Sequence, residues 1–323
     1  MPSIVTHYSF ASDVYKKLDF KTQERTDKET MEIFAQSFDY FFYYNFLDFK
    51  HGKSIRDIAK MAHRSNTQLY FINIVKYILN NNLQENKEVM GYLYGSLTHY
   101  TLDTICHPFI FFKTGVYYKN IKATFKYRGM HTKMEKNIDA YYSKAQFKKP
   151  LYKLNIVKEV IPRHKFSKDV LDTISWVYKE TYNKENIGPF VKKAYKNARN
   201  LYRFFIQDKS GIKRKLYGLI DFFHRKGMVL KNYSFHIAAE DLRFLNLDKK
   251  HWCHPCDDSI ISDASFLDLY NEALKKTVKI IKEINKVLYE NQDIKSLVKV
   301  IDNASYITGL PIEKNKRLQF FEY

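Results

Sequence analysis

Residues 91–109, GYLYGSLTHYTLDTICHPF, carry three potential metal ligands at helical spacing. His99, Asp103 and His107 follow one another at i, i+4 and i+8, so on a helix they lie on one face with adjacent Cβ atoms roughly 5–6 Å apart. The rest of the stretch is largely apolar, and unpaired polar groups are costly to bury there. Because imidazole nitrogen and carboxylate oxygen are usual zinc ligands, a metal ion would compensate these three side chains.

Other histidines and carboxylates extend this pattern. His131 and Glu135, in HTKME, repeat the i, i+4 spacing on the next expected helix. His63 interrupts an apolar stripe, His7 lies near the start, and Asp39 lies within the aromatic run FDYFFYYNF. A single histidine on an apolar face is usually a core residue held by hydrogen bonds. An HxxxDxxxH motif followed closely by HxxxE is much rarer by chance, so we predict that all of these residues bind metal.

The composition favours helices, and the net charge has two explanations. The chain has 323 residues, with 26 Tyr and 25 Phe but only 10 Gly and 7 Pro, and sheet-rich folds use more Gly and Pro at their turns. Lys and Arg total 54 against 35 acidic residues, a net charge of +19. Such a charge attracts phosphate-bearing partners, either nucleic acid or an anionic membrane surface. Lysines spread over solvated helix faces are the favoured explanation of the charge, because no dense basic block is present.

Apolar periodicity predicts an all-α fold. Residues 55–80 form either one helix or a broken pair, with an apolar stripe through Ile58, Ala62, Leu69, Ile72, Val75 and Leu79. Further helices are expected at 87–112, 118–144, 167–182, 190–207, 212–224 and 265–290. The last begins with Ser265 and Asp268 at capping-box spacing.

Two regions are expected along the chain. Pro150 and Pro162 mark a joint within residues 148–168. We therefore expect a metal-binding helical core in residues 1–150 and a C-terminal helical region in 151–323 that packs on it within the same domain. A separate cap domain is the alternative, and residues 246–263 are expected to form a loop.

Targeting signals are not evident in the sequence. The opening MPSIVTHYSF lacks a basic start, an apolar stretch and a small-residue cleavage site. The longest uncharged window, Val89 to Leu102, is shorter than the roughly 20 apolar residues of a membrane span. We expect a soluble cytoplasmic protein.

A second group of soft ligands lies in HxCHxC, formed by His251, Cys253, His254 and Cys256. Such residues can bind a structural zinc, and a CxxC pair can be redox-active. Four ligands in so short a stretch are cramped for one tetrahedral ion, and no partner pair lies nearby. Neither role is favoured.

The sequence resembles the zinc-dependent phospholipase C family, which is related more distantly to the P1-type nucleases. The resemblance rests on THYSFA, SFDYFF, the AH of AKMAHRS, LTHYTLDTICHP and HTKME. The segment HWCHPCDDSIISDASFLDLYNEA is similar to a C-terminal segment of intracellular bacterial members. The resemblance implies a multi-helical fold with a C-terminal helical extension and a cluster of two or three zinc ions.

The resemblance also implies which residues bind each ion. One ion would be held by Asp39, His63, His99 and Asp103, a second by His107, His131 and Glu135, and a third by His7 and the bridging Asp103. In secreted members the free amino terminus completes the third site. No processing site is evident here, so Pro2 exposed by removal of Met1 is the candidate substitute.

The function implied by the resemblance is hydrolysis of a phosphodiester by a zinc-activated water, most plausibly phospholipase C cleavage of a phospholipid. Asp39 is the candidate catalytic residue that orients or deprotonates the water, and Tyr40 matches an aromatic position that lines the choline pocket in secreted members. Peripheral contact with an anionic membrane is a further expectation, and nucleic acid is a less favoured partner. The alternatives are a P1-type nuclease, another phosphohydrolase, or a non-catalytic zinc-binding protein at the membrane surface.

Overall fold

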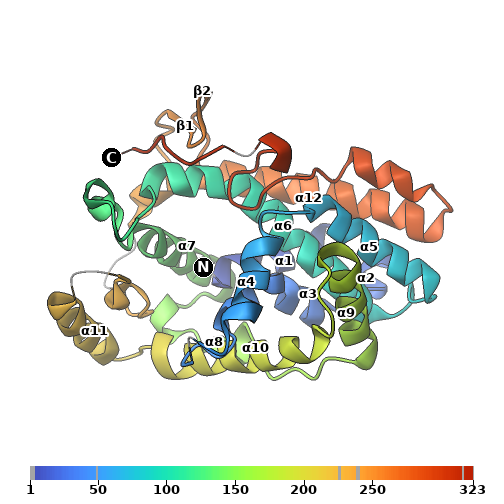
Figure 1. Cartoon of the computed structure of the whole chain (residues 1–323), viewed down its shortest axis with the longest axis horizontal. Coiled ribbons are helices and arrows are strands. Elements are labelled where there is room, and N and C mark those ends of the chain that lie inside the picture. The colour runs from blue at the N-terminus through green and yellow to red at the C-terminus, as the bar shows by residue number, and fades with distance from the viewer. Residues whose placement is uncertain (1–3, 49, 225–226, 238–240, 315, 323) are drawn as a thin grey trace.

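Helix α6 (Lys87–Thr114) lies in the middle of the molecule and is buried along most of its 28 residues (Figure 1). Its first turn is capped by Asn86, whose side-chain oxygen accepts hydrogen bonds from the backbone N–H groups of Glu88 and Val89. The helix ends at Gly115, which adopts a positive φ. The predicted helix at 87–112 is therefore confirmed.

The computed structural model describes residues 4–48, 50–224, 227–237, 241–314 and 316–322. Besides α6, the α-helices in this part of the chain are α1 (Ile4–Lys17), α2 (Phe20–Glu24), α3 (Lys28–Phe34), α4 (Lys53–Ala62), α5 (Thr67–Asn80), α7 (Met130–Phe147), α8 (Ile156–Glu159), α9 (Lys168–Tyr182), α10 (Gly188–Leu201), α11 (Ile212–Phe223) and α12 (Phe266–Tyr289). Short 3-10 turns are η1 (Ser37–Tyr43), η2 (Lys122–Tyr127), η3 (Leu151–Lys153), η5 (Leu230–Asn232), η6 (Leu242–Leu245), η7 (Ile294–Lys299) and η8 (Ile312–Lys314), and η4 (Tyr202–Ile206) is a π-helical turn. The all-α prediction is confirmed. In the described residues no helix has the length and apolar character needed to cross a membrane.

Two glycines of α6 let α3 approach it very closely. A Cβ atom at Gly91 would lie 2.7 Å from the Asp27 carbonyl oxygen, and one at Gly95 would lie 2.4 Å from the Met31 carbonyl oxygen. Any larger residue would push the two helices apart. The close packing brings Ala35, the residue that ends α3, against His99.

Helix α12 packs along the other side of α6. Ser265 and Asp268 form the predicted capping box at its start. Its buried face includes Ala273, Thr277 and Ile280, and the Thr277 hydroxyl lies 2.5 Å from that of Thr101 on α6.

The start of α1 is capped by a residue from a distant helix. The Asp139 carboxylate on α7 accepts hydrogen bonds from the backbone N–H and the hydroxyl of Thr6, both at 2.8 Å. This contact satisfies a first-turn donor of α1 and fixes the position of the adjacent His7. Burial raises the pKa of Asp139 to about 7.

Two helix predictions were wrong in part. Residues 55–80 are a broken pair, as one of the two alternatives had it, but the predicted stripe is only partly correct on α5, where Val75 is buried and Leu69 is not. Leu69 is 38% exposed, whereas Tyr70, Phe71 and Ile74 are buried. Asn66 adopts the left-handed backbone conformation and separates α4 from α5. The helical periodicity therefore does not continue from one helix into the next, as the predicted stripe assumed.

The predicted helix at 118–144 is also too long at its start. Residues 122–127 form η2, and Gly129 adopts a positive φ of 73° before α7 begins at Met130. Residues 246–263, expected to be a loop, contain a small antiparallel hairpin of β1 (Trp252–His254) and β2 (Asp257–Ser262).

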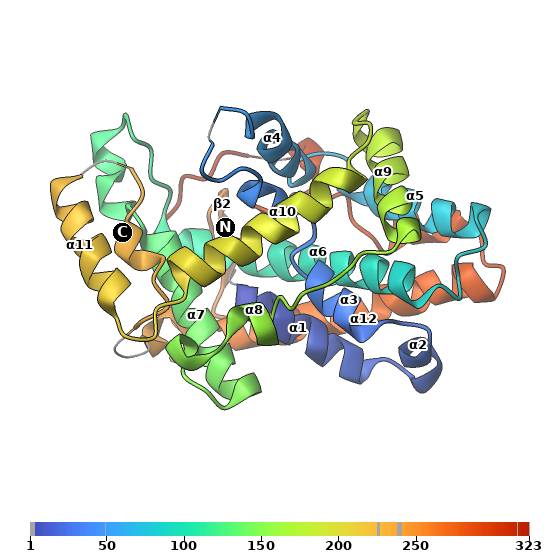
Figure 2. The same ribbon diagram turned by 90° about the horizontal axis from the view of Figure 1, so that it is seen from below.

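Side chains from both halves of the chain share the hydrophobic core. The buried apolar residues form one cluster that extends from Ile4 to Tyr306. Figure 2 shows α10 crossing the face of the molecule, and this helix packs against η1 and α9. The division at residue 150 stays a prediction.

Candidate metal centre

The structure brings all eight predicted ligands together in the interior. They come from separate elements: His7 from α1, Asp39 from η1, His63 from the end of α4, His99, Asp103 and His107 from α6, and His131 and Glu135 from α7. The ligand atoms form three groups: Asp39, His63 and His99; His7, His99 and Asp103; and His107, His131 and Glu135. Within each group the atoms lie within 4.8 Å of one another. Metal binding by these residues remains a prediction.

Three of the histidines are oriented by backbone carbonyl groups. The Nδ1 atom of His63 lies 2.7 Å from the Ala59 carbonyl oxygen, that of His99 lies 3.0 Å from Ala35, and that of His107 lies 2.6 Å from Tyr306. A carbonyl oxygen can only accept, so Nδ1 carries the proton in each ring. The opposite nitrogen, Nε2, is left to bind a cation, which is the usual arrangement of metal-bound histidine.

The carboxylate of Asp39 faces two of these rings. Its Oδ1 lies 3.1 Å from His63 Nε2, and its Oδ2 lies 3.9 Å from His99 Nε2. With the His63 proton on Nδ1, both atoms of the shorter contact are acceptors. They repel each other unless a proton or a metal ion lies between them.

Asp103 stands between two histidines in the same way. Its Oδ1 lies 3.2 Å from His7 Nε2, and its Oδ2 lies 3.5 Å from His99 Nε2. The Oδ2 atom is also 3.7 Å from His107 Nδ1, the nitrogen that donates to Tyr306. The two oxygens of one carboxylate therefore face different histidines, and His99 also belongs to the group of Asp39 and His63, so Asp103 is placed as a residue that bridges two ions would be.

Within the described part of the chain, several polar atoms of the cluster are buried without a hydrogen-bond partner. They are His7 Nδ1, Asp39 Oδ1, His99 Nε2, Asp103 Oδ2 and His131 Nδ1. Leaving such groups unpaired is unfavourable, by about 1–3 kcal/mol each. Their concentration at one place, with nitrogen and carboxylate oxygen as the donor set, fits divalent cations such as zinc.

The electrostatics of the cluster keep its carboxylates ionised. Burial opposes ionisation of Asp39 and Asp103, but the neighbouring histidines hold the pKa of both carboxyls below the ordinary value. Burial lowers the pKa of His99 to about 4, so its ring is neutral at pH 7. Burial also disfavours protonation of His7, but Asp103 raises the pKa of its ring above the ordinary value.

The third group lies at the more open end of the cluster. The side chains of His107 and His131 are 13% and 24% exposed, whereas that of His99 is fully buried. Glu135 lies 3.1 Å from His131 Nε2, and although burial opposes its ionisation, His131 holds the pKa of its carboxyl below the ordinary value. A substrate reaching the cluster from solvent would meet this group first.

Tyr40 lies in the core. Its side chain is 1% exposed, its hydroxyl donates to the Ile33 carbonyl oxygen at 2.9 Å, and its ring packs edge-on against Tyr195. A role in substrate binding stays a prediction, and the contacts of the side chain lend it no support.

The chain belongs to a known family. The family model described as zinc dependent phospholipase C matches residues 6–205. This is the zinc-dependent phospholipase C family. The match includes all eight potential ligands. They therefore lie in the part of the chain that is similar to a family of zinc-dependent hydrolases. No curated protein and no solved structure matches the chain.

Two residues that support the cluster in this zinc-dependent phospholipase C family member were not predicted from the sequence. Tyr306 lies in the C-terminal part, its N–H donates to the His63 carbonyl oxygen at 3.1 Å, and its ring lies 5.4 Å from that of His99. Asp139 holds the start of α1. Neither residue belongs to a local motif, since each acts through a contact that is distant in sequence.

The HxCHxC segment has structural contacts. His254 Nε2 donates to the Thr308 carbonyl oxygen at 2.8 Å, and the Cys256 thiol donates to the Lys316 carbonyl oxygen at 3.3 Å. The groups of potential metal ligands in the described residues do not include these side chains. The suggested ligand role of Pro2 falls outside the described residues.

Proposed function

We propose that the protein is a zinc-dependent phosphodiesterase of the phospholipase C type, which cleaves a phospholipid between its glycerol oxygen and the head-group phosphate. Family membership supports this reaction class. The carrying observation is the set of ligand atoms that face one another in the cluster, above all Asp39 Oδ1 and His63 Nε2 at 3.1 Å, a pair that needs a proton or a cation between its atoms.

The geometry supports the ion assignment that the resemblance implies. In this proposal Asp39, His63, His99 and Asp103 hold one ion, His107, His131 and Glu135 hold a second, and His7 with Asp103 contributes to a third. Asp103 fits the bridging role because its two oxygens face different histidines.

Bound zinc would offset the negative charge of the phosphate oxygens and lower the pKa of a coordinated water toward 7. The residues of the chain then have separate tasks. Asp39, held as a carboxylate by the histidines beside it, orients the attacking water and accepts its proton. The partly exposed His107 and His131 lie at the open end, where the phosphate would enter. The water oxygen forms a new bond to phosphorus while the bond between phosphorus and the glycerol oxygen breaks. The proton taken from the water ends on the departing glycerol oxygen, so the products are diacylglycerol and the phosphorylated head group.

The test is zinc content measured together with turnover. We expect two or three zinc ions per chain and hydrolysis of p-nitrophenyl phosphorylcholine by the wild-type protein. His99→Ala and Glu135→Ala should lose both metal and activity, because each removes a buried ligand from its group. His51→Ala is the matched control, since that side chain is 82% exposed and lies outside the cluster.

Other outcomes would contradict the proposal. Hydrolysis of single-stranded nucleic acid without hydrolysis of the choline ester would indicate a P1-type nuclease. Bound zinc without turnover on any phosphodiester would indicate a non-catalytic protein. Full activity of either ligand variant would show that the site is wrongly placed.

A further inference from the structure

Helix α11 presents its apolar face to solvent. Ile212, Leu216, Leu219 and Phe223 follow one another at helical spacing on one face, and they are 68%, 54%, 57% and 70% exposed. None of the residues of α11 is fully buried. A surface helix of a globular protein normally turns its apolar face to the core, so this orientation is reversed.

Hydrogen bonds on the opposite face hold α11 in this orientation. The Asp221 carboxylate accepts from the backbone N–H groups of Leu230 and Lys231, at 2.8 and 2.9 Å. The Tyr217 hydroxyl donates to the Phe205 carbonyl oxygen at 2.9 Å. The polar face is therefore used for attachment to the protein, and the apolar face is left for a partner.

More exposed apolar side chains lie at the same end of the molecule as α11 (Figures 1 and 2). They include Phe204, Phe205 and Met228 near the helix, and Tyr118, Ile121 and Phe125 in the segment before α7. Arg128 joins the two segments, because its guanidinium donates to the carbonyl oxygens of His224 and Gly227, both at 2.8 Å. Figures 1 and 2 show α11 and this segment at the same end of the molecule.

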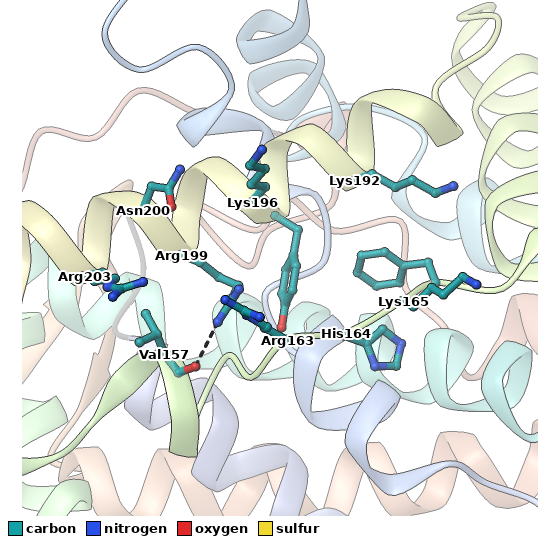
Figure 3. A pocket seen from close by; sticks show the side chains of 11 residues that line it. Val157, Arg163, His164, Lys165, Lys192, Lys196, Arg199, Asn200 and Arg203 are labelled. Atoms are coloured by element: carbon teal, nitrogen blue, oxygen red, sulfur yellow. Dashed lines mark hydrogen bonds between the residues drawn. The ribbon is translucent and has the colours of Figure 1, made fainter.

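Basic side chains accompany the apolar ones. Lys213 and Lys215 border the apolar face of α11, and Lys119, Lys122 and Lys126 alternate with the exposed residues of the other segment. A cavity of about 500 Å³ along α10 is lined mostly by basic side chains, as Figure 3 shows. Its basic lining residues are Arg163, His164, Lys165, Lys192, Lys196, Arg199 and Arg203, and Arg203 directly precedes the exposed Phe204. His164 of this lining pairs with Glu29 and Glu88.

The docking face, defined as α11 together with residues 118–125, is attached close to the open end of the metal cluster. The Asn232 amide, in the turn that follows α11, donates to the Gly129 carbonyl oxygen at 2.8 Å. Gly129 directly precedes α7, which carries His131 in its first turn. A partner on the docking face would therefore lie near the more exposed group of ligands.

We propose that the docking face inserts into the interfacial layer of an anionic lipid bilayer. The partner is a membrane because exposed aromatic and aliphatic side chains bordered by lysine combine apolar burial with attraction to anionic head groups. The inference rests on the proposed function for its biological purpose, since docking here would bring phospholipid to the cluster. The physical interaction does not require catalysis.

Vesicle binding tests the docking face. Wild-type protein should co-sediment with vesicles of phosphatidylcholine and phosphatidylglycerol, and more weakly with phosphatidylcholine alone or at raised salt. The double variant Leu219→Ser with Phe223→Ser should bind about tenfold or more weakly, because two side chains that enter the bilayer are removed. Lys215→Glu should weaken binding only to the anionic vesicles.

A matched double variant serves as the control. Phe20→Ser with Ile261→Ser removes side chains that are 74% and 67% exposed on α2 and β2, and it should bind as the wild type does. All variants should hydrolyse soluble p-nitrophenyl phosphorylcholine at the wild-type rate.

The outcomes separate this inference from the proposed function. In one outcome the wild-type protein hydrolyses no phosphodiester but binds vesicles, and the Leu219→Ser, Phe223→Ser variant loses that binding. This outcome would support the docking face and contradict the proposed enzymatic function. Zinc-dependent hydrolysis with unchanged vesicle binding in that variant would overturn the docking face alone. A solution dimer that this variant dissociates, in a protein that binds no vesicles, would also overturn it, because the partner would be a second copy.

Discussion

The Nδ1–H of His107 donates a hydrogen bond to the backbone carbonyl of Tyr306 across 2.6 Å. Tyr306 lies outside residues 6–205, which match the family model, so the C-terminal part of the chain helps to orient a potential ligand. The same residue donates its N–H to the carbonyl of His63. The backbone N–H and C=O of Tyr306 are thereby bonded to two histidines that belong to different groups of the cluster.

The turn after Tyr306 depends on Gly309. This residue has a φ of +67°, and a Cβ atom there would lie 2.2 Å from the Thr104 carbonyl oxygen. That carbonyl has no intrahelical donor, because Pro108 lacks an N–H. We predict that Gly309→Ala lowers the free energy of unfolding by about 1–3 kcal/mol and weakens zinc binding, since the Tyr306 carbonyl must move.

Urea unfolding and a zinc titration measure both effects. Gly218→Ala is the control, because it lies within α11 and nothing lies within 4 Å of the added Cβ. It should be neutral or stabilising by about 0.5–1 kcal/mol. Wild-type stability and zinc affinity in Gly309→Ala would show that this turn does not support the cluster.

The cap provided by Asp139 predicts a pH dependence. Burial raises the pKa of this carboxyl from 3.8 to about 7, so between these values the folded protein holds a proton that the unfolded chain releases. The contribution of Asp139 to stability is therefore greatest below about pH 4, falls as the pH rises to about 7 and is constant above that. Asp139→Asn does not titrate and keeps an oxygen that accepts from Thr6.

We expect Asp139→Asn to gain stability relative to the wild type between pH 4 and 7, by on the order of 1–4 kcal/mol. The comparison uses urea unfolding of the metal-free proteins, because bound cations would lower the pKa of Asp139. The titration of His99 opposes this trend but is shared by both proteins, so the difference isolates Asp139. A difference that does not change with pH would contradict the assignment.

The cysteines of the hairpin should be irrelevant to metal binding. Burial raises the pKa of the Cys256 thiol to about 11, so the thiolate is scarce at neutral pH. We predict that Cys253→Ser with Cys256→Ser leaves the zinc content per chain unchanged, and that Cys256 in the folded wild type reacts slowly with thiol reagents. Elemental analysis and a thiol-labelling time course measure these properties. Loss of one zinc per chain would instead place an ion at the hairpin.

Local patterns predicted the parts of the fold that local physics determines. The i, i+4 and i+8 spacing of His99, Asp103 and His107 required only that α6 be a helix. The capping box of Ser265 and Asp268 is likewise complete within four residues. Convergence of these ligands with those of α1, η1, α4 and α7 rested on the family resemblance, because spacing on one helix does not determine how helices pack.

The features that the sequence did not reveal depend on distant contacts. Leu69 was placed on the wrong face because the left-handed Asn66 breaks the phase between α4 and α5. Tyr306 and Asp139 support the cluster across long sequence separations. The reversed face of α11 has the same periodicity as a core-facing helix, so only the structure shows that Phe223 points to solvent.

Anomalous X-ray diffraction at the zinc absorption edge, from crystals grown with zinc, would test the central claim most directly. The account predicts strong peaks enclosed by Asp39, His63 and His99 and by His107, His131 and Glu135, with a third beside His7 and Asp103 if that site fills. Protein that diffracts well but shows no peak among these side chains, or shows zinc only at the HxCHxC hairpin, would contradict it.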